Sequence, residues 1–561
     1  MSIGNDNTSF NLMDRQWLQV IMKQDGAVLE LSIKETLRRA KDIECLTGDN
    51  TIQQFALVRL LEAIVYGSFG NDFNEDAWWG LYERGPEDED VWHRIEQYCD
   101  IYHDRFDLFD AKQPFYQVAG LHTAKHEVSG LERIILDVPA GDRLFTIRGG
   151  ESLQTMSAAE AARWLVTVQA FDPSGIKSGA VGDPRVKGGK GYPIGVAWSG
   201  HLGGYICEGN DLWITLMLNY VSRHAISAGH MDVDWTTDTP IWERPPLTQC
   251  AQDGYDQPAE STGVPRYFHG PATLYTWQSR RILLSHDGET VNGVLICNGD
   301  RLKPQNAENY EPMTSWRRSD AQEKKLKIPV VYMPRKHDPS RALWRNLPTI
   351  TVADAYDVAS VPERLRPLTF NWLQQLQLGT SLDMPIRIHA YGVEYGNQEA
   401  VIDTIVDDKL DLNLSVLTSK NPQVGDAIAK AVNIVDAGIR ELAGFAGNLA
   451  KAAGRPEETP RAHAHELAYS QFDYAFRQWI ATVTEETIDE DIARWKKTAK
   501  SLLYRLCDDL SQQASPQAIV GREISSRNPK TGETTSRHYD AAVAQIWFRA
   551  KINTIIPKEG E

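Results

Sequence analysis

The last third of the chain carries an apolar pattern that restricts the fold more than any other part of the sequence. Apolar residues recur at intervals of three and four positions from Val424 to Leu449, and Gly454 and Pro456 follow as helix-ending residues. This spacing puts the apolar side chains on one face of a long helix. Because such a stripe needs a partner surface, we expect further helices to cover it.

Three further segments show the same periodicity and supply those partners. Their apolar positions are Leu467, Phe472, Ala475, Phe476 and Trp479; Ile488, Ile492, Trp495, Leu502 and Leu506; and Val543, Ile546, Trp547 and Ala550. Four amphipathic helices with mostly short connections predict a four-helix bundle. The link 525–537 is longer, and Arg527, Lys530 and Arg537 lie there among Gly, Ser and Thr, which predicts an exposed basic loop.

The part of the chain before the bundle mixes several patterns. Residues 10–20 alternate between apolar and polar side chains, which predicts a strand, whereas residues 51–64 and 157–171 have helical spacing. We therefore expect an α+β protein. It has a large, irregular, mixed α/β N-terminal domain in residues 1–408 and a C-terminal four-helix bundle in residues 409–561.

Composition limits the classes of function. The chain has 561 residues, 42% of them hydrophobic, which fits a globular protein of two or more domains. A net charge of −17 argues against a protein that coats nucleic acid indiscriminately, so contacts with nucleic acid should be local. The six cysteines include no C-x-x-C pair, and the N-terminus lacks a signal sequence. We expect a cytoplasmic protein with no disulfide framework and no membrane contact.

Residues 171–191, the glycine-rich loop, form the least regular stretch of the chain. Six glycines, two prolines and four cations share these 21 positions without apolar periodicity, which predicts an exposed loop. Glycines let a backbone approach a ligand closely, and Lys177, Arg185, Lys187 and Lys190 would attract phosphates. The pattern favours a nucleic-acid backbone as the ligand. A solvated flexible loop is the alternative.

A β-hairpin is predicted further along the chain. Residues 386–390 and 401–406 form its strands, and Asn397 and Gln398 stand at its tip. Two exposed carboxamides on a rigid hairpin can contact base edges or take the space of a displaced base pair. The alternative is that these residues are present only because they favour turns.

No convincing catalytic constellation is present in the sequence. The dipeptides at 286–287 and 337–338 are His-Asp pairs, as in metal-dependent phosphohydrolases, but a glycine and a proline follow them, which indicates turns. A nucleophile elbow, an H-E-x-x-H helix and a dinucleotide fingerprint are all missing. We expect a recognition protein rather than an enzyme, without metal or cofactor. A standalone metal-dependent nucleic-acid enzyme and a purely structural bundle protein are the alternatives.

Several separated motifs together resemble one family. They are the opening F-N-L-x-D-R-x-W at residues 10–17, the run 172–180, the segment 274–281, the Asn397-Gln398 hairpin and the C-terminal helices. In this order they are similar to the large subunit of the type I-E CRISPR Cascade complex, the CasA family. The resemblance covers essentially the whole chain, although about residues 232–270 match poorly.

The resemblance implies a non-enzymatic subunit of an RNA-guided complex for antiviral defence. Such a subunit recognises the protospacer-adjacent motif of double-stranded DNA through the minor groove, helps to open the duplex for the R-loop and recruits a helicase-nuclease. The minor groove presents a degenerate pattern, which tolerates more than one motif. The implied partners are the other Cascade subunits, the CRISPR guide RNA, the target DNA and the helicase-nuclease effector.

The resemblance also implies which residues bind. The implied DNA-binding residues are Gly175, Ile176, Lys177, Ser178, Gly179, Ala180, Arg301, Lys303, Asn397 and Gln398. Among them Arg301 or Lys303 would be a basic finger, and Gln398 would be a wedge between base pairs. Phe145, Thr146 and Arg148 would contact the guide RNA or a neighbouring subunit. The chain departs from the family in carrying Lys177 and Ser178 where the loop can be all glycine, and in lacking the zinc knuckle of some members.

Overall fold

The structure is a computed structural model that describes residues 8–136, 138, 153–225, 234–252, 269–351, 361–376, 384–419, 421–527 and 534–557. Contacts between Cα atoms divide the chain into two compact units. The first unit comprises Met1–Arg341, Ala353–Ser381 and Ile386–Lys409, and the second comprises Ala342–Val352, Leu382–Pro385 and Leu410–Glu561. Among the described residues, no helix is long and apolar enough to span a membrane.

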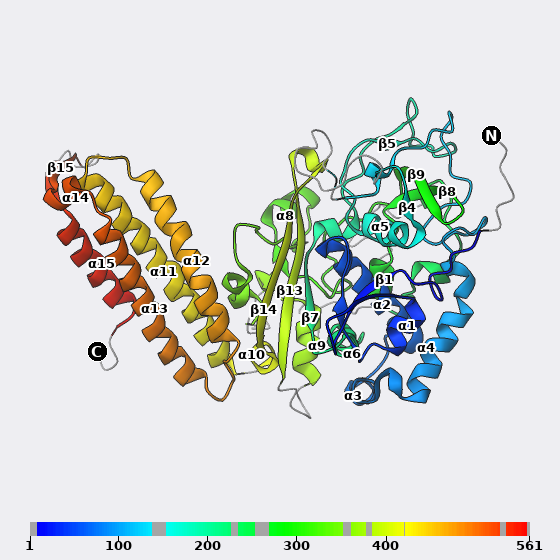
Figure 1. Ribbon diagram of the computed structural model, residues 1–561, viewed down its shortest axis with the longest axis horizontal. Coiled ribbons are helices and arrows are strands. Elements are labelled where there is room, and N and C mark those ends of the chain that lie inside the picture. The colour runs from blue at the N-terminus through cyan, green and yellow to red at the C-terminus, as the bar shows by residue number, and fades with distance from the viewer. Residues whose placement is uncertain are drawn as a thin grey trace. The chain divides into compact units, whose positions relative to one another are not determined.

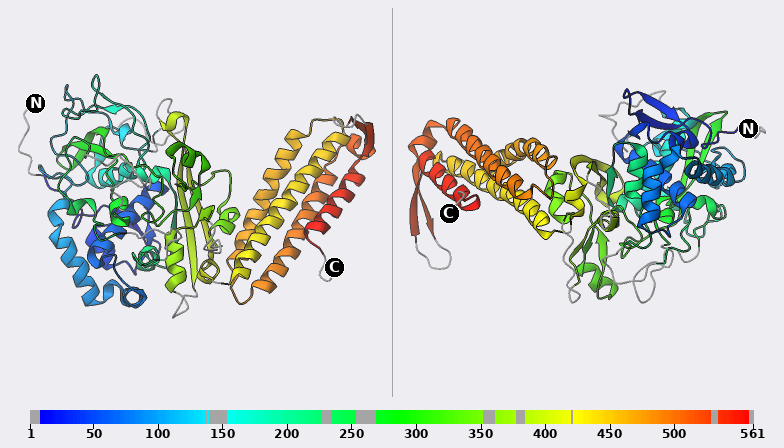
Figure 2. Two further views of the ribbon diagram at one scale, coloured as in Figure 1. Left: turned by 180° about the vertical axis from the view of Figure 1, so that it is seen from behind. Right: turned by 90° about the horizontal axis from the view of Figure 1, so that it is seen from below.

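The second unit is a helical bundle (Figures 1 and 2). Its helices are α10 (Leu414–Thr418), α11 (Pro422–Ala452), α12 (Glu458–Ile480), α13 (Ile488–Gln512), α14 (Pro516–Val520) and α15 (Ala541–Ile555). Helix α11 contacts α12, α13 and α15 along its length, so its predicted apolar stripe is covered. The central ring is Trp495 of α13, which is fully buried and lies 5.1 Å from the ring centres of Phe476 and Trp479 of α12. The predicted four-helix bundle is confirmed.

The buried face of α15 differs from the predicted one. Ala544, Phe548 and Ile552 are buried, whereas Ile546 is 64% exposed. Both the predicted and the observed positions recur every three or four residues. Periodicity alone therefore could not choose between two neighbouring apolar faces, and the contact with α11 decides which one is buried.

The link between α14 and α15 is also more regular than predicted. Strands β15 (Arg522–Arg527) and β16 (Thr534–Tyr539) pair antiparallel, with Ser525 opposite Ser536. The guanidinium carbon of Arg537 lies 4.3 Å from the ring centre of Trp547, so this cation covers an aromatic ring of α15. The prediction of a loop is wrong for these two segments, because a ladder of backbone hydrogen bonds orders them.

The first unit is built around a helix that is buried on nearly all sides. The helices of this unit are α1 (Ile33–Arg38), α2 (Thr51–Phe69), α3 (Glu75–Arg84), α4 (Glu89–Ile101), α5 (Ala158–Phe171), α6 (Leu212–Asn219), α7 (Pro271–Tyr275), α8 (Asp320–Leu326) and α9 (Leu368–Leu376). The buried helix is α2. Helix α2 begins where the side chain of Asn50 accepts a hydrogen bond from the amide of Gln53. It packs against α4, α5 and α7, and it buries Arg59 in an ion pair with Glu311 at 2.7 Å.

Short sheets surround these helices. Their strands are β1 (Leu18–Met22), β2 (Val28–Leu31), β3 (Ile43–Leu46), β4 (Met156–Ser157), β5 (Lys177–Ser178), β6 (Lys190–Gly191), β7 (Gly203–Glu208), β8 (Arg280–Asp287), β9 (Thr290–Asn298), β10 (Trp316–Arg318), β11 (Tyr332–Pro334), β12 (Arg364–Leu365), β13 (Pro385–Tyr395) and β14 (Ile402–Asn413). The strand orders are β2-β1-β3, β11-β10-β12, β14-β13-β7 and β4-β9-β5-β6, and β8 pairs with β9. The long strands β13 and β14 pair with each other, and β13 also pairs with β7 (Figure 1), so the predicted hairpin is confirmed. The sheets of β9 and β13 position the candidate site.

Candidate nucleic-acid interface

The glycine-rich loop is more ordered than the sequence predicts. Strand β5 pairs with β6, and Ser178 is also paired with Cys297 of β9. Gly179 is buried, and a Cβ atom there would lie 2.6 Å from the backbone of Gly189. Gly179 is therefore needed for the packing of the loop's own two arms.

Gly175 has the opposite environment within the same loop. Its φ is +141°, a backbone conformation that residues other than glycine rarely adopt. No atom lies within 4 Å of the position that a Cβ would take. The neighbouring Ile176 is 53% exposed. Of the two glycines, only Gly175 leaves open space that a ligand could approach.

Two of the loop's four cations form ion pairs with carboxylates of the protein. The Nζ of Lys177 lies 2.6 Å from the carboxylate of Asp172, and the Lys177 side chain is only 13% exposed. Burial lowers the pKa of Lys177, and the Asp172 carboxylate opposes this shift. Arg185 pairs with Asp183 at 2.9 Å, whereas Lys187 and Lys190 are exposed. Of the four cations expected to attract phosphates, Lys177 and Arg185 are thus already paired with carboxylates of the protein.

A buried arginine fixes the start of the loop. Arg280, the first residue of β8, forms an ion pair with Asp172. Its guanidinium also donates to the carbonyl oxygens of Pro173 at 3.1 Å and Gly195 at 2.9 Å. Because Arg280 is 2% exposed and Asp172 is 2% exposed, this is a desolvated pair, and Arg280 holds the backbone near the start of the loop and just beyond its end.

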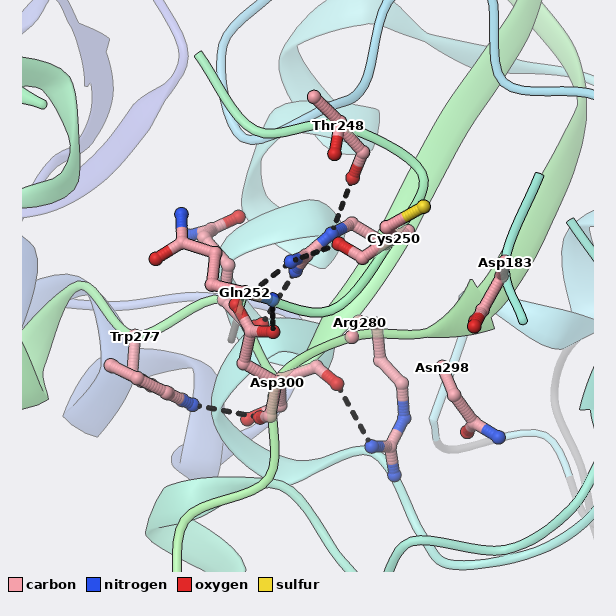
Figure 3. Close-up of polar contacts among 12 residues, drawn as sticks. Asp183, Thr248, Cys250, Gln252, Trp277, Arg280, Asn298 and Asp300 are labelled. Atoms are coloured by element: carbon pink, nitrogen blue, oxygen red, sulfur yellow. Dashed lines mark hydrogen bonds and ion pairs between the residues drawn. The ribbon is translucent and has the colours of Figure 1, made fainter. Parts of the chain in front are cut away.

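The next residue of β8 fixes the finger segment, residues 300–305. Successive side chains of a strand point to opposite sides, and Arg281 ion-pairs with Asp300 at 2.8 Å. The carboxylate of Asp300 also accepts from the amide of Gln252 at 2.9 Å, and Trp277 Nε1 donates to the Asp300 carbonyl oxygen at 2.9 Å (Figure 3). This network holds the root of the segment that carries Arg301 and Lys303.

Arg301 and Lys303 lie just beyond that root. Arg301 is exposed and Lys303 is half-buried. Burial first, and then the charges of Lys336, Arg301 and Arg280, lower the pKa of the nearby His201 to about 3. Three cations from separate segments therefore act on one imidazole, and the ring is kept neutral in a positive environment.

The hairpin tip, residues 396–401, carries both predicted carboxamides and is exposed from Asn397 to Ala400. Gln398 has φ 57° and ψ 21°, and Glu399 has φ 57°, so two successive residues other than glycine are left-handed. The amide of Ser174 donates to the carbonyl oxygen of Glu399 at 2.8 Å. The structure thus brings the glycine-rich loop and the tip into direct contact.

A groove lies between these segments. It has a volume of about 610 Å³. Its walls are the segment 172–177 and the residues Glu132, Arg133, Ile135, Leu136, Val138, Ala400, Val401, Ile402, Asp403 and Ile405. Its apolar lining is Ile135, Leu136, Val138, Ile176, Val401, Ile402 and Ile405. The predicted guide-contacting residues Phe145, Thr146 and Arg148 lie outside the described residues.

Sequence reasoning missed the residues that hold the interface together. These are Asp172, Ser174, Arg280, Arg281 and Tyr395. For two of them the sequence held a signal in the consecutive arginines at positions 280 and 281, since two adjacent buried cations need two buried partners.

Comparison with known proteins identifies the family. The matching family model is that of the CRISPR-associated protein Cse1, and the match spans residues 11–506. A CasA/Cse1 protein of Thermus thermophilus is 26% identical over 499 residues, which are 85% of this chain and 88% of the relative. The crystal structure of Thermobifida fusca Cse1 matches with a TM-score of 0.85 and 38% identity, covering 98% of this chain and 99% of that one. Cse1 of Acidimicrobium ferrooxidans shares the fold, with a TM-score of 0.75, 24% identity and 98% of both chains covered. The resemblance stated from the motifs is confirmed, and the chain belongs to the CRISPR-associated Cse1 (CasA) family.

Proposed function

We propose that this Cse1 family protein is the DNA-recognition subunit of a Cascade surveillance complex. In this role it recognises the protospacer-adjacent motif through the minor groove, starts duplex opening and recruits a helicase-nuclease, with no catalytic step of its own. A chain in a structure described as a CRISPR RNA-guided surveillance complex has the same fold, with a TM-score of 0.67, 17% identity and 97% of this chain covered. The partners would be the other Cascade subunits, the guide RNA, the target DNA and the effector nuclease.

One observation supports this proposal above the others. The glycine-rich loop contacts the hairpin tip through Ser174 and Glu399, and it contacts the residues next to the finger segment through Arg185 and the Gly299 carbonyl oxygen at 2.9 Å. Three segments that the resemblance implies in DNA binding are therefore neighbours in space.

Each segment would make a different kind of contact. Gly175 offers open backbone that could lie against a minor-groove edge, while Lys187 and Lys190 could reach phosphates. Gln398 at the exposed tip would hold apart the first base pairs beside the motif. Lys177 would act inside the loop through Asp172 rather than on the DNA.

The test uses the reconstituted assembly with its guide RNA. We expect tight binding of duplexes with the correct motif and weak, steeply salt-dependent binding by the isolated chain, because a net charge of −17 gives little bulk attraction. Lys187→Ala and Lys190→Ala should weaken binding of correct and incorrect motifs equally and reduce the salt slope by about 0.9 per lost phosphate contact. Lys430→Ala, an exposed lysine of the bundle, is the matched control.

The wedge is tested by strand opening. Gln398→Ala should slow opening of a fully paired target and should matter much less on a target that is already unpaired beside the motif. Equal loss on both targets would contradict a wedge. Divalent-metal-dependent cleavage by the purified chain would favour a standalone enzyme instead, and a native pull-down without short RNAs or further subunits would contradict the assembly.

A further inference from the structure

A second hydrogen bond joins the hairpin to the glycine-rich loop, and it comes from a tyrosine that no motif singles out. The hydroxyl of Tyr395, the last residue of β13, donates to the carbonyl oxygen of Phe171 at 2.7 Å. Phe171 directly precedes Asp172. The bond therefore reaches the loop at the point where Arg280 fixes it.

The tyrosine hydroxyl occupies a closely fitted site. A Cβ atom at Gly200 would overlap it, so the chain approaches the phenol here with glycine. The Nζ of Lys336 lies 5.1 Å from the centre of the Tyr395 ring. Burial raises the pKa of Tyr395 well above its usual value, so the hydroxyl keeps its proton and remains a donor. These contacts restrict the orientation of the Tyr395 side chain.

The segment beyond Tyr395 depends on support from outside the hairpin. Gln398 and Glu399 both have φ 57°, a region that residues other than glycine seldom occupy, and seldom in succession. Within the tip, the amide of Glu399 donates to the carbonyl oxygen of Gly396 at 2.9 Å. The amide of Gly396 donates to the carbonyl oxygen of Val401 at 3.0 Å. From outside the hairpin, the amide of Ser174 donates to the carbonyl oxygen of Glu399. The loop thus helps to hold the tip in a sparsely populated conformation.

We propose that Tyr395 is a positioning residue that couples the glycine-rich loop to the wedge at Gln398. This inference rests on the proposed function. Tyr395 holds Phe171, and with it Asp172 and Ser174, at a fixed distance from the tip. The Ser174 amide is then in place to hold Glu399. When a duplex binds to the loop near Gly175, the contact between Ser174 and Glu399 transmits the effect of binding to the wedge at Gln398.

The test is Tyr395→Phe in the guide-loaded assembly, because this change removes the hydroxyl and keeps the ring beside Lys336. Losing one buried hydrogen bond should slow opening of a fully paired target by about 3- to 10-fold. Affinity for a target already unpaired beside the motif should stay within about 2-fold of wild type, since no contact with DNA is removed. Opening is followed by a fluorescent base beside the motif.

Tyr391→Phe is the matched control. Tyr391 lies on the same strand, but its hydroxyl contacts His389 and Glu208 rather than the loop. The control should open the paired target at the wild-type rate. If Tyr395→Phe also opens at the wild-type rate, or if both variants are slowed equally, the coupling is wrong.

A readout without DNA separates this inference from the proposed function. In the isolated protein, the amide of Ser174 should exchange its hydrogen about 3-fold or more faster in Tyr395→Phe than in wild type, because the loop loses its second tie to the hairpin. Unchanged exchange would overturn the inference. A wild-type assembly that shows no motif-dependent opening would instead overturn the proposed function and leave the exchange result standing.

Discussion

In the bundle, Trp495 is covered by Phe476 and Trp479 from the neighbouring helix, whereas in the interface Asp172 is covered by Arg280 from a position 108 residues away. The first contact buries apolar area and is non-directional, so similar shapes can replace it. The second is a desolvated ion pair with fixed hydrogen-bond geometry, so removing one partner leaves a buried charge. The two regions should therefore respond differently to substitution.

The largest effect is expected in the bundle core. Trp495→Ala removes a fully buried ring and its hydrogen bond to the Ala431 carbonyl oxygen at 3.2 Å. We expect the free energy of unfolding of the bundle to fall by about 4 kcal/mol. Trp495→Phe should lose much less, because an apolar ring still fills the space. Because the chain has two units, the measurement is amide hydrogen exchange in α11 and α13. The control Trp547→Ala, at a half-buried ring, should cost less than about 1 kcal/mol.

Arg280→Met should have the next largest effect. It leaves the Asp172 carboxylate buried and removes the donors to Pro173 and Gly195. Breaking such a pair costs about 3 to 5 kcal/mol, and we expect about 3 because Lys177 still neutralises Asp172 at 2.6 Å. Urea unfolding followed by exchange of amides near the loop measures it. Arg461→Met breaks an exposed pair with Glu457 in the bundle and should cost less than about 0.5 kcal/mol. Similar losses for the two arginines would remove the distinction between the regions.

Two glycines of the glycine-rich loop should differ in how much stability their substitution by alanine costs. Gly179→Ala forces a methyl group against the Gly189 backbone, and we expect a loss of about 2 kcal/mol in stability. Gly175→Ala meets open space and should cost about 1 kcal/mol, through its φ of +141° alone. Urea midpoints of the two variants test this order. The reverse order would show that the loop's arms do not pack as described.

The smallest effect concerns pH. His201 has a folded-state pKa of about 3 against an ordinary value of 6.5, because of burial and then the cations Lys336, Arg301 and Arg280. Below pH 6.5 the unfolded chain binds a proton that the folded chain does not, so stability falls as the pH is lowered. Since the ring is only half-buried, we expect wild type to lose about 1 kcal/mol more than His201→Phe between pH 8 and pH 5.

Urea unfolding at both pH values measures this difference. His463→Phe, at an exposed histidine of the bundle, should lose stability with falling pH as wild type does. If His201→Phe loses as much stability as that control, burial and the nearby cations do not lower the pKa of His201 in the folded protein.

The sequence by itself determined the helices of the bundle, the hairpin of β13 and β14 and the family. Those features rest on local spacing, as from Val424 to Leu449, or on short motifs in a fixed order. The same spacing failed for α15, where Ile546 is exposed and Phe548 is buried, because two neighbouring faces are both apolar.

Only the tertiary structure decided how the interface is made. A lysine in a glycine-rich loop looks exposed until Asp172 and Arg280 are seen beside it, and Gly179 looks like a ligand contact until Gly189 is seen against it. The left-handed Gln398 could not be read from a turn sequence either. These properties depend on partners far away in the chain, and burial and ion pairing are set by such long-range contacts rather than by the residues on either side.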